Sequence, residues 1–133
     1  MTERKRRILI VDDEASLTRL LKAAVENAGP YEVLTANTAA DGLRIAGDSR
    51  PDLILLDMIM PDRSGRDLAK DLGASETLKS VPIVFLTASI PRDPTVIQQG
   101  LIDGHPVIAK PVSVDELLRR LEEPLRVGPP NPS

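Results

Sequence analysis

Five residues that could do chemistry directly follow short apolar runs of this 133-residue chain. They are three carboxylates, a hydroxyl and an ammonium: Asp12, Asp13, Asp57, Thr87 and Lys110. Crowded carboxylates repel one another, and Mg²⁺ relieves that repulsion because it accepts one or two carboxylates, keeps several waters and binds phosphate oxygens. A carboxylate with an oxygen that is not coordinated to the metal can attack phosphorus and form an aspartyl phosphate. Lysine, hydroxyl and backbone N–H groups then stabilise the charged oxygens of the transferred group.

Each of these residues also has an ordinary structural explanation when it is considered alone. Asp12 or Asp13 could cap the helix that follows the first apolar run. Thr87 could satisfy a turn, and Lys110 could extend its ammonium into water from the end of a strand. Asp57 is harder to explain in this way, because no helix begins directly after it.

The apolar runs have the length and composition of strands that are buried on both faces. Four such strands and a weaker fifth are expected at residues 8–11, 53–56, 83–86, 107–109 and 32–35. Helical periodicity alternates with them, and it predicts helices near residues 17–28, 38–46, 65–72, 94–100 and 113–125. This alternation predicts a doubly wound α/β fold with a five-stranded parallel sheet and helices on both faces. The carboxyl ends of such strands meet at one edge, which brings the five polar residues together.

Local signals set the expected ends of these helices. Gly29 and Pro30 stop the first helix, and Gly47 ends the second. The last helix begins with a capping box, in which Ser113 and Glu116 satisfy backbone N–H groups at its start.

The composition, with 41% hydrophobic and 28% charged residues, is that of one ordinary globular domain. The absence of cysteine excludes disulfides, thiolate metal sites and thiol catalysis. Tyr31 and Phe85 are the only aromatic residues, which excludes an aromatic platform for stacking nucleic-acid bases. The chemistry above needs no histidine base, and His105, the only histidine, is expected in a solvated loop.

The net charge is −3, and four basic residues precede the first apolar run, so the rest of the chain is more acidic. An acidic body lacks the basic face that phosphate neutralisation needs, which argues against direct binding of nucleic acid. The expected organisation is a basic tail at residues 1–6, a folded domain at 7–126 and a Pro-rich tail or truncated linker at 127–133. The first apolar run stops at Asp12, so no signal peptide or membrane span is expected and the predicted location is cytoplasmic.

Several segments of the chain resemble the receiver domains of bacterial two-component response regulators. The similar parts are an acidic strand end, an acceptor strand with its loop, and two short motifs: residues 8–14, residues 51–61, Thr87-Ala88 and Lys110-Pro111. The resemblance covers approximately residues 7–125. It implies a flavodoxin-like sheet with strand order 2-1-3-4-5.

The resemblance also implies a metal site and an acceptor. Asp57 is the implied phosphoacceptor. Asp13, Asp57 and the main-chain carbonyl of Ile59 are the implied ligands of Mg²⁺, and Asp12 is implied to act on the metal through a water molecule.

The remaining matched residues are implied to hold the phosphoryl group. Lys110 pairs with it, Thr87 binds it and then shifts position, and the N–H of Ala88 helps to hold it. The Lys110–Pro111 peptide bond is implied to be cis. Three residues before the lysine the family usually carries Tyr or Phe, but this chain has Val107, so a coupled threonine–aromatic switch is left open.

Three functions fit these residues. The joint motif favours a phosphorylation-dependent switch of the single-domain type, not an enzyme, which receives its phosphoryl group from a sensor histidine kinase or a histidine phosphotransfer protein. The second is a receiver-like interaction module that never turns over phosphate. The third is a Mg²⁺ phosphohydrolase of the haloacid-dehalogenase type, which needs a second acid where Ile59 stands. The downstream protein target is left open, as is a homodimer, and no membrane or nucleic-acid partner is expected.

Overall fold

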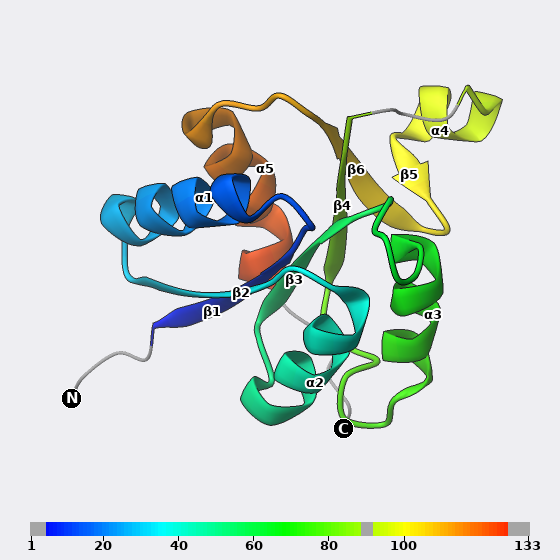
Figure 1. Cartoon of the computed structure of the whole chain (residues 1–133). Helices are drawn as coiled ribbons and strands as arrows, with labels where there is room; N and C mark the ends of the chain where they lie inside the picture. Colours follow the sequence, from blue (N-terminus) through cyan, green and yellow to red (C-terminus); the bar gives the residue numbers. More distant parts are fainter. Residues whose placement is uncertain (1–4, 89–91, 128–133) are drawn as a thin grey trace.

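A central sheet of six strands runs through the residues that the computed structural model describes, 5–88 and 92–127 (Figure 1). Its five parallel strands are β1 (Arg6–Val11), β2 (Tyr31–Ala36), β3 (Leu53–Asp57), β4 (Ile83–Thr87) and β6 (His105–Ala109). A short sixth strand, β5 (Leu101–Ile102), pairs antiparallel with β6. The strand order is β2-β1-β3-β4-β6-β5, so the order in which successive strands are added reverses between β1 and β3, which are themselves parallel.

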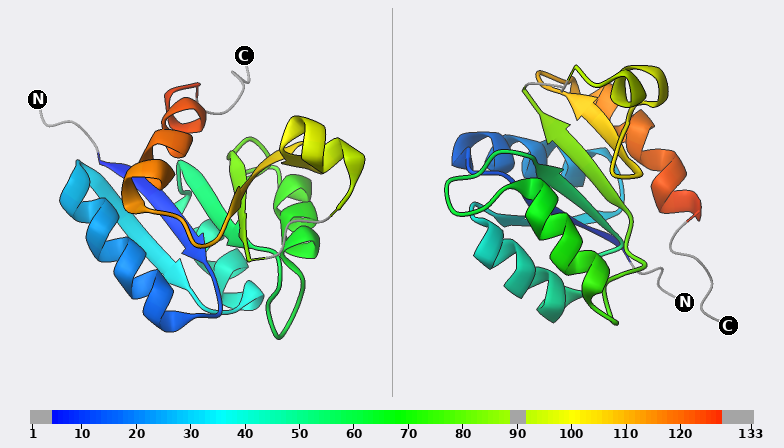
Figure 2. Two further views of the ribbon diagram at one scale, coloured as in Figure 1. Left: turned by 90° about the horizontal axis from the view of Figure 1, so that it is seen from above. Right: turned by 90° about the vertical axis from the view of Figure 1, so that its right-hand side faces the viewer.

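Helices cover both faces of the sheet (Figure 2). One face packs against α1 (Ala15–Ala28) and α5 (Val114–Val127). The other packs against α2 (Ala39–Ser49), α3 (Gly65–Ala74) and α4 (Pro94–Gln99). Neighbouring residues of each buried strand divide between the two layers: in β1, Ile8 and Ile10 belong to the first core and Leu9 and Val11 to the second. This arrangement explains the uninterrupted apolar runs, because both faces of the inner strands exclude water.

The predicted doubly wound α/β fold is confirmed, and its five predicted parallel strands lie in the predicted order. The antiparallel β5 was not predicted, because a strand of two residues is too short to show a hydrophobic period. It turns back into β6 through two residues with positive φ, 52° at Asp103 and 83° at Gly104, and Gly100, directly before β5, has a φ of 67°. This hairpin extends the sheet beyond β6 and widens its far edge.

The prediction that His105 lies in a solvated loop is wrong. His105 is the first residue of β6, and its half-buried ring packs edge-on against Phe85 with 5.7 Å between ring centroids. Burial lowers the pKa of His105, with the charge of Asp103 acting in the opposite direction. The histidine is therefore part of the packing of the β4–β6 layer.

Two of the expected helix ends can be compared with local geometry. The prediction that Gly47 ends the second helix is wrong, because α2 continues to Ser49 and Arg50 follows with a left-handed φ of 50°. A glycine inside an exposed helix costs only about 1 kcal/mol, which the packing of α2 offsets. At the start of α5, Ser113 Oγ accepts a hydrogen bond from the N–H of Glu116 at 3.1 Å, as one half of the capping box requires.

β1 begins at Arg6, one residue before the expected start of the folded domain. Arg7 is tied to the body, because its N–H donates to Asp52 and its guanidinium to the carbonyl of Ser49. The expected tails otherwise fall mostly on residues 1–4 and 128–133, which lie outside the described residues. Within the described part of the chain, no helix is both long and apolar enough to cross a membrane.

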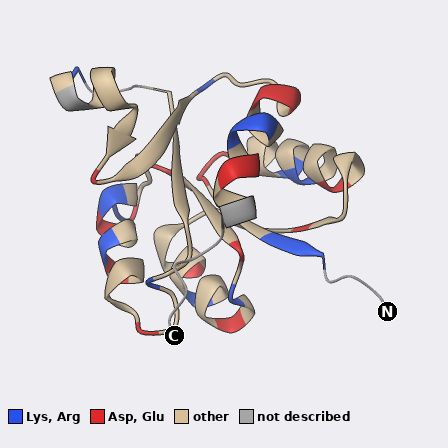
Figure 3. Ribbon diagram, turned by 180° about the vertical axis from the view of Figure 1, so that it is seen from behind, with Lys and Arg blue, Asp and Glu red and all other residues tan. Residues whose placement is uncertain are grey.

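Acidic and basic residues are mixed along the helices in the ribbon of Figure 3. On α3, Arg66 forms a two-bond ion pair with Asp103 of the β5–β6 turn, at 2.9 Å and 2.8 Å. Arg63, just before α3, pairs with Asp71 on that helix. These pairs join the hairpin and the β3–α3 loop to the body of the domain.

Candidate functional site

The polar residues singled out in the sequence lie at the carboxyl ends of adjacent parallel strands (Figure 1). β3 ends at Asp57, and the register pairs Thr87, the last residue of β4, with Ala109 on β6. Asp12 and Lys110 directly follow β1 and β6. The topology therefore brings residues from four strand ends to one edge of the sheet, as expected from the reversal of strand order.

The three carboxylates form a compact acidic cluster. One oxygen from each of Asp12, Asp13 and Asp57 lies within 4.8 Å of the other two. Asp12 and Asp57 are only 1% and 6% exposed, whereas Asp13 is exposed. Three negative groups this close repel one another strongly, and burial of two of them weakens the screening by water.

The explanation of Asp12 or Asp13 as the cap of α1 is wrong. Glu14 occupies the N-cap position, and its side chain makes no capping hydrogen bond. Asp12 Oδ1 instead accepts a hydrogen bond from the N–H of Glu14 at 2.9 Å. Asp12 is thus fixed at the end of β1, with its other carboxylate oxygen directed to the acidic cluster and Lys110.

Lys110 supplies the positive charge of the site. Its Nζ lies 2.6 Å from Asp12 Oδ2, 3.2 Å from Glu14 Oε1 and 3.8 Å from Asp57 Oδ2. Its main-chain N–H donates to the carbonyl of Thr87 at 2.8 Å, and the peptide bond to Pro111 is cis, as predicted. Burial disfavours the charged ammonium, but the ion pair with Asp12 and the other carboxylates around it outweigh burial and raise the pKa of Lys110.

The Asp57 carboxyl has an unusually high pKa for an aspartate. Burial raises this pKa from 3.8 to about 6, and repulsion from Asp12 acts in the same direction. The charge of Lys110 and a long hydrogen bond of 3.4 Å from the N–H of Ile59 to Asp57 Oδ1 oppose the shift. Asp57 is still mostly ionised at neutral pH and can act as a nucleophile there.

This raised pKa gives a first prediction, for protein in metal-free buffer. Asp57→Asn is expected to stabilise the domain at neutral pH by on the order of 1 to 2 kcal/mol. A carboxyl with a higher pKa in the folded than in the unfolded protein binds more protons when folded, so stability falls as the pH rises from about 4 to about 6. The amide does not ionise and escapes this loss. Urea unfolding at several pH values measures the difference in unfolding free energy between Asp57→Asn and the wild type. A difference that does not grow as the pH rises would contradict the raised pKa.

The donor set of the acidic cluster fits a hard divalent cation. All the side-chain donors are carboxylate oxygens, which Mg²⁺ prefers, and the exposed Asp13 leaves room for water and phosphate ligands. Asp12 Oδ2 is buried and accepts no well-formed hydrogen bond in the described structure, although the Lys110 ammonium lies beside it. The Ile59 side chain is 69% exposed at the start of the β3–α3 loop, where its carbonyl follows Asp57 by two residues.

The other predicted residues border this cluster. Thr87 is 1% exposed at the end of β4, and Ala88 follows it. Val107 is buried within β6, in register with Phe85, so it supplies no aromatic ring where the receiver family usually has one. Sequence reasoning did not predict that Glu14 contacts Lys110, although its place directly after the Asp12-Asp13 pair was a signal.

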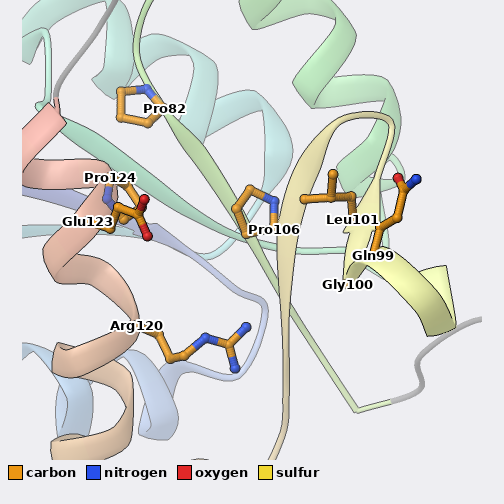
Figure 4. Close-up of a pocket in the computed structure, with 8 residues that line it drawn as sticks. All are labelled: Pro82, Gln99, Gly100, Leu101, Pro106, Arg120, Glu123 and Pro124. Carbon is orange, nitrogen blue, oxygen red and sulfur yellow. The ribbon is translucent and has the colours of Figure 1, made fainter. Parts of the chain in front are cut away.

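One hollow of the described structure adjoins the site. A groove of about 420 Å³ is lined by Glu14, Lys110 and Ala88 together with apolar residues of α1, including Leu20, which is 63% exposed. A separate cavity of about 490 Å³ lies between the β5–β6 edge and α5, where Arg120 is among the lining residues (Figure 4). None of the predicted site residues lines this second cavity.

Comparison with known proteins agrees with the resemblance to receiver domains over most of the chain. The family model described as response regulator receiver domain matches residues 8–122. The phosphate regulon transcriptional regulatory protein PhoB of Pseudomonas aeruginosa is 42% identical over 124 residues, which cover 92% of this chain and 53% of PhoB. The polar-differentiation response regulator DivK of Brucella anthropi is 30% identical over 116 residues, which cover 86% of this chain and 92% of DivK.

Solved structures show the same fold. A CheY-like response regulator receiver domain protein from Methanospirillum hungatei superimposes with a TM-score of 0.80 at 30% identity, covering 92% of this chain and 95% of that one. The chain spans about half the length of the first curated relatives it matches. Because the family model matches residues 8–122, which make up most of the sequence, the chain belongs to the receiver domain family of two-component response regulators.

Proposed function

We propose that this receiver domain is a phosphorylation-dependent switch that accepts a phosphoryl group on Asp57 in the presence of Mg²⁺. The observation that carries the proposal is the meeting of one ammonium with the acidic cluster. Lys110 Nζ lies 3.8 Å from Asp57 Oδ2, and the three carboxylates lie within 4.8 Å of one another. This arrangement combines a nucleophile, a cation site and a fixed positive charge in one place.

In the proposed reaction an oxygen of the Asp57 carboxylate attacks the phosphorus of the donor. A new P–O bond forms, and the bond from phosphorus to the leaving group breaks with its electron pair on the leaving group. Asp13, Asp57 and the carbonyl of Ile59 would hold Mg²⁺, with Asp12 acting through a water molecule. The bound metal would neutralise charge on the phosphoryl oxygens.

The chain's own groups then hold the phosphoryl group. The Lys110 ammonium forms ion pairs with Asp12 and Glu14 and lies 3.8 Å from Asp57 Oδ2. It therefore needs only a short movement to reach oxygens on Asp57. The Thr87 hydroxyl and the N–H of Ala88 would donate hydrogen bonds to the remaining oxygens. Thr87 ends β4 and Lys110 directly follows β6, so both side chains start from strand ends close to Asp57 and need to move only a short way.

The proposed donor is a sensor histidine kinase or a histidine phosphotransfer protein, in the cytoplasm. Membership of the receiver family implies a partner of this class. The groove beside the site supports a protein donor, because Leu20 of α1, which is exposed, lines it together with Lys110 and Ala88. An enzymatic role as a phosphohydrolase has no support at position 59, where an isoleucine stands.

Incubation with a small phosphodonor tests the proposal without the natural kinase. Acetyl phosphate with Mg²⁺ is expected to add one phosphate to the wild-type chain, and EDTA is expected to prevent the addition. Intact-mass spectrometry measures both results. A chain that stays unmodified with Mg²⁺ and acetyl phosphate would instead favour an interaction module that does not turn over phosphate.

Mg²⁺ is expected to raise the melting temperature of the wild-type domain, because it binds the folded site in preference to the unfolded chain. The increase should be smaller for Asp13→Asn, which removes one proposed ligand. Without metal this variant is expected to be at least as stable as the wild type, since one of three clustered negative charges is lost. Thermal unfolding with and without Mg²⁺ provides the measurement. An undiminished Mg²⁺ effect in Asp13→Asn would place the metal elsewhere.

A further inference from the structure

The loop that follows Asp57 is fastened to the start of α2 by Asp62. Its Oδ1 accepts a hydrogen bond from the N–H of Ala39 at 3.0 Å, and its Oδ2 accepts one from the N–H of Ala40 at 3.1 Å. These donors belong to the first helical turn, which has no acceptors of its own for them. The side chain of Thr38, the N-cap residue, accepts a hydrogen bond from the next N–H, that of Asp41. Asp62 therefore completes the cap of α2 from a different segment of the chain.

The same entry to α2 is also fastened to the end of β1. Asn37 Nδ2 donates a hydrogen bond to the carbonyl of Asp12 at 2.8 Å, and the N–H of Asp12 donates to the carbonyl of Ala36 at 3.0 Å. Gly42, in the second turn of α2, lies so close to Val11 that a Cβ at this position would meet its methyl carbons at 2.9 Å and 3.0 Å. The start of α2 is thus packed firmly against the strand end that carries Asp12.

The other end of the loop is fixed to α3. The N–H of Gly65 donates to the carbonyl of Met58 at 2.8 Å, and a Cβ on Gly65 would lie 2.1 Å from the carbonyl oxygen of Asp57. Ser64 caps α3 through the N–H of Asp67. Ile59 therefore lies in a short loop with one attachment at α3 and a second, through Asp62, at α2.

We infer that Asp62 and Asn37 are positioning residues that form a hydrogen-bonded bridge between the Ile59 segment and the Asp12 segment, holding the proposed metal and acceptor site in register. The inference rests on the proposed function and extends it to residues outside the acidic cluster. A Mg²⁺ ion demands near-ideal distances from ligands on both segments, so their relative position sets its affinity. Removal of a hydrogen bond that fixes a ligand in this way commonly lowers metal affinity by about 10- to 100-fold.

Asp62→Ala and Asp41→Ala provide a matched pair of variants. Each removes one exposed carboxylate close to the start of α2, but the Asp41 carboxylate pairs with Arg44 of its own helix and not with the β3–α3 loop in the described part of the chain. Asp62→Ala is expected to raise the Mg²⁺ concentration at half-saturation about tenfold, at the low end of the range for such bonds. Asp41→Ala is expected to change it less than twofold, by general electrostatics alone. NMR titration of the folded proteins with Mg²⁺ measures both values.

A second measurement uses protein without metal and does not depend on phosphorylation. Amide hydrogen exchange at Ile59 and Ala39 is expected to be faster in Asp62→Ala than in Asp41→Ala, because only the first variant opens the bridge. Asn37→Ala should shift Mg²⁺ affinity in the same direction as Asp62→Ala, since it cuts the bridge at its other end.

The outcomes separate this inference from the proposed function. Equal Mg²⁺ affinities for Asp62→Ala and Asp41→Ala, in variants that melt at similar temperatures, would overturn the bridge. A wild-type chain that binds no Mg²⁺ would overturn the proposed metal site instead. In that case unchanged exchange at Ile59 in Asp62→Ala would still show that Asp62 does not order the loop.

Discussion

Lys110→Ala is expected to slow phosphorylation of Asp57 by acetyl phosphate about a hundredfold at saturating Mg²⁺, the usual effect of losing one fixed donor to a developing charge. The Lys110 ammonium is the only side-chain cation within 4.0 Å of Asp57 among the described residues. Without it the phosphoryl oxygens lose a fixed positive partner. Asp12 and Asp57 also face each other without a neutralising charge, which favours the protonated and unreactive form of Asp57.

Two further variants separate the charge of Lys110 from its packing. Lys110→Met keeps most of the side-chain volume and should be as slow as Lys110→Ala. Lys79→Ala removes a lysine that pairs with Glu76 on the surface and should react at the wild-type rate. The measurement is the initial rate of phosphate incorporation by mass spectrometry. A Lys110→Met variant that reacts as fast as the wild type would remove the lysine from the proposed mechanism.

Ile59→Asn is expected to shorten the lifetime of the aspartyl phosphate about tenfold, which corresponds to about 1.4 kcal/mol of barrier. Hydrolysis needs a water opposite the aspartyl oxygen, and an amide two residues after Asp57 can hold that water by a hydrogen bond. The isoleucine cannot do so, and its branched side chain, on a residue that is 69% exposed, is expected to shield the phosphorus. The wild-type phosphoprotein is therefore expected to be long-lived without a partner.

Ile97 offers a matched control for this prediction. It is 70% exposed, like Ile59, but lies on α4. Ile97→Asn should leave the lifetime unchanged, and Ile59→Val should keep it close to the wild-type value because a branched chain remains. From the sequence, Ser89, two residues after Thr87, is also expected to border the phosphoryl group, and it lies outside the described residues. Phosphate release from purified phosphoprotein gives the lifetimes, and equal decay of Ile59→Asn and wild type would show that this side chain does not control water access.

The site could be predicted from the sequence because its residues occupy simple positions. Asp57, Thr87 and Lys110 each end or follow a continuous apolar run, and parallel strands place such ends at one edge. β1, β3 and β4 are buried on both faces, and each contains four consecutive apolar residues. Such continuous runs distinguish these strands from amphipathic helices, in which polar residues recur. The geometry of the acidic cluster follows from this topology, while the roles of its members in phosphoryl transfer stay predictions.

The features that sequence reasoning missed depend on contacts between distant segments. Asp62 caps a helix that begins 23 residues earlier in the chain, and no local pattern links the two. His105 directly follows Asp103 and Gly104, so in the sequence it resembles a loop residue. Its ring is held by a contact with Phe85 on the neighbouring strand, which no local pattern shows. Gly47 resembled a helix end because glycine commonly stops helices, but tertiary packing carried α2 two residues further.

Mass spectrometry of the wild type and Asp57→Asn, after incubation with Mg²⁺ and acetyl phosphate, tests the central claim most directly. Asparagine keeps the shape of the side chain but cannot form an acyl phosphate. The variant should therefore still fold, and only the covalent step should be lost. We expect one added phosphate on the wild type and none on Asp57→Asn. Equal modification of the two proteins would show that Asp57 is not the acceptor, and would contradict the account of this site.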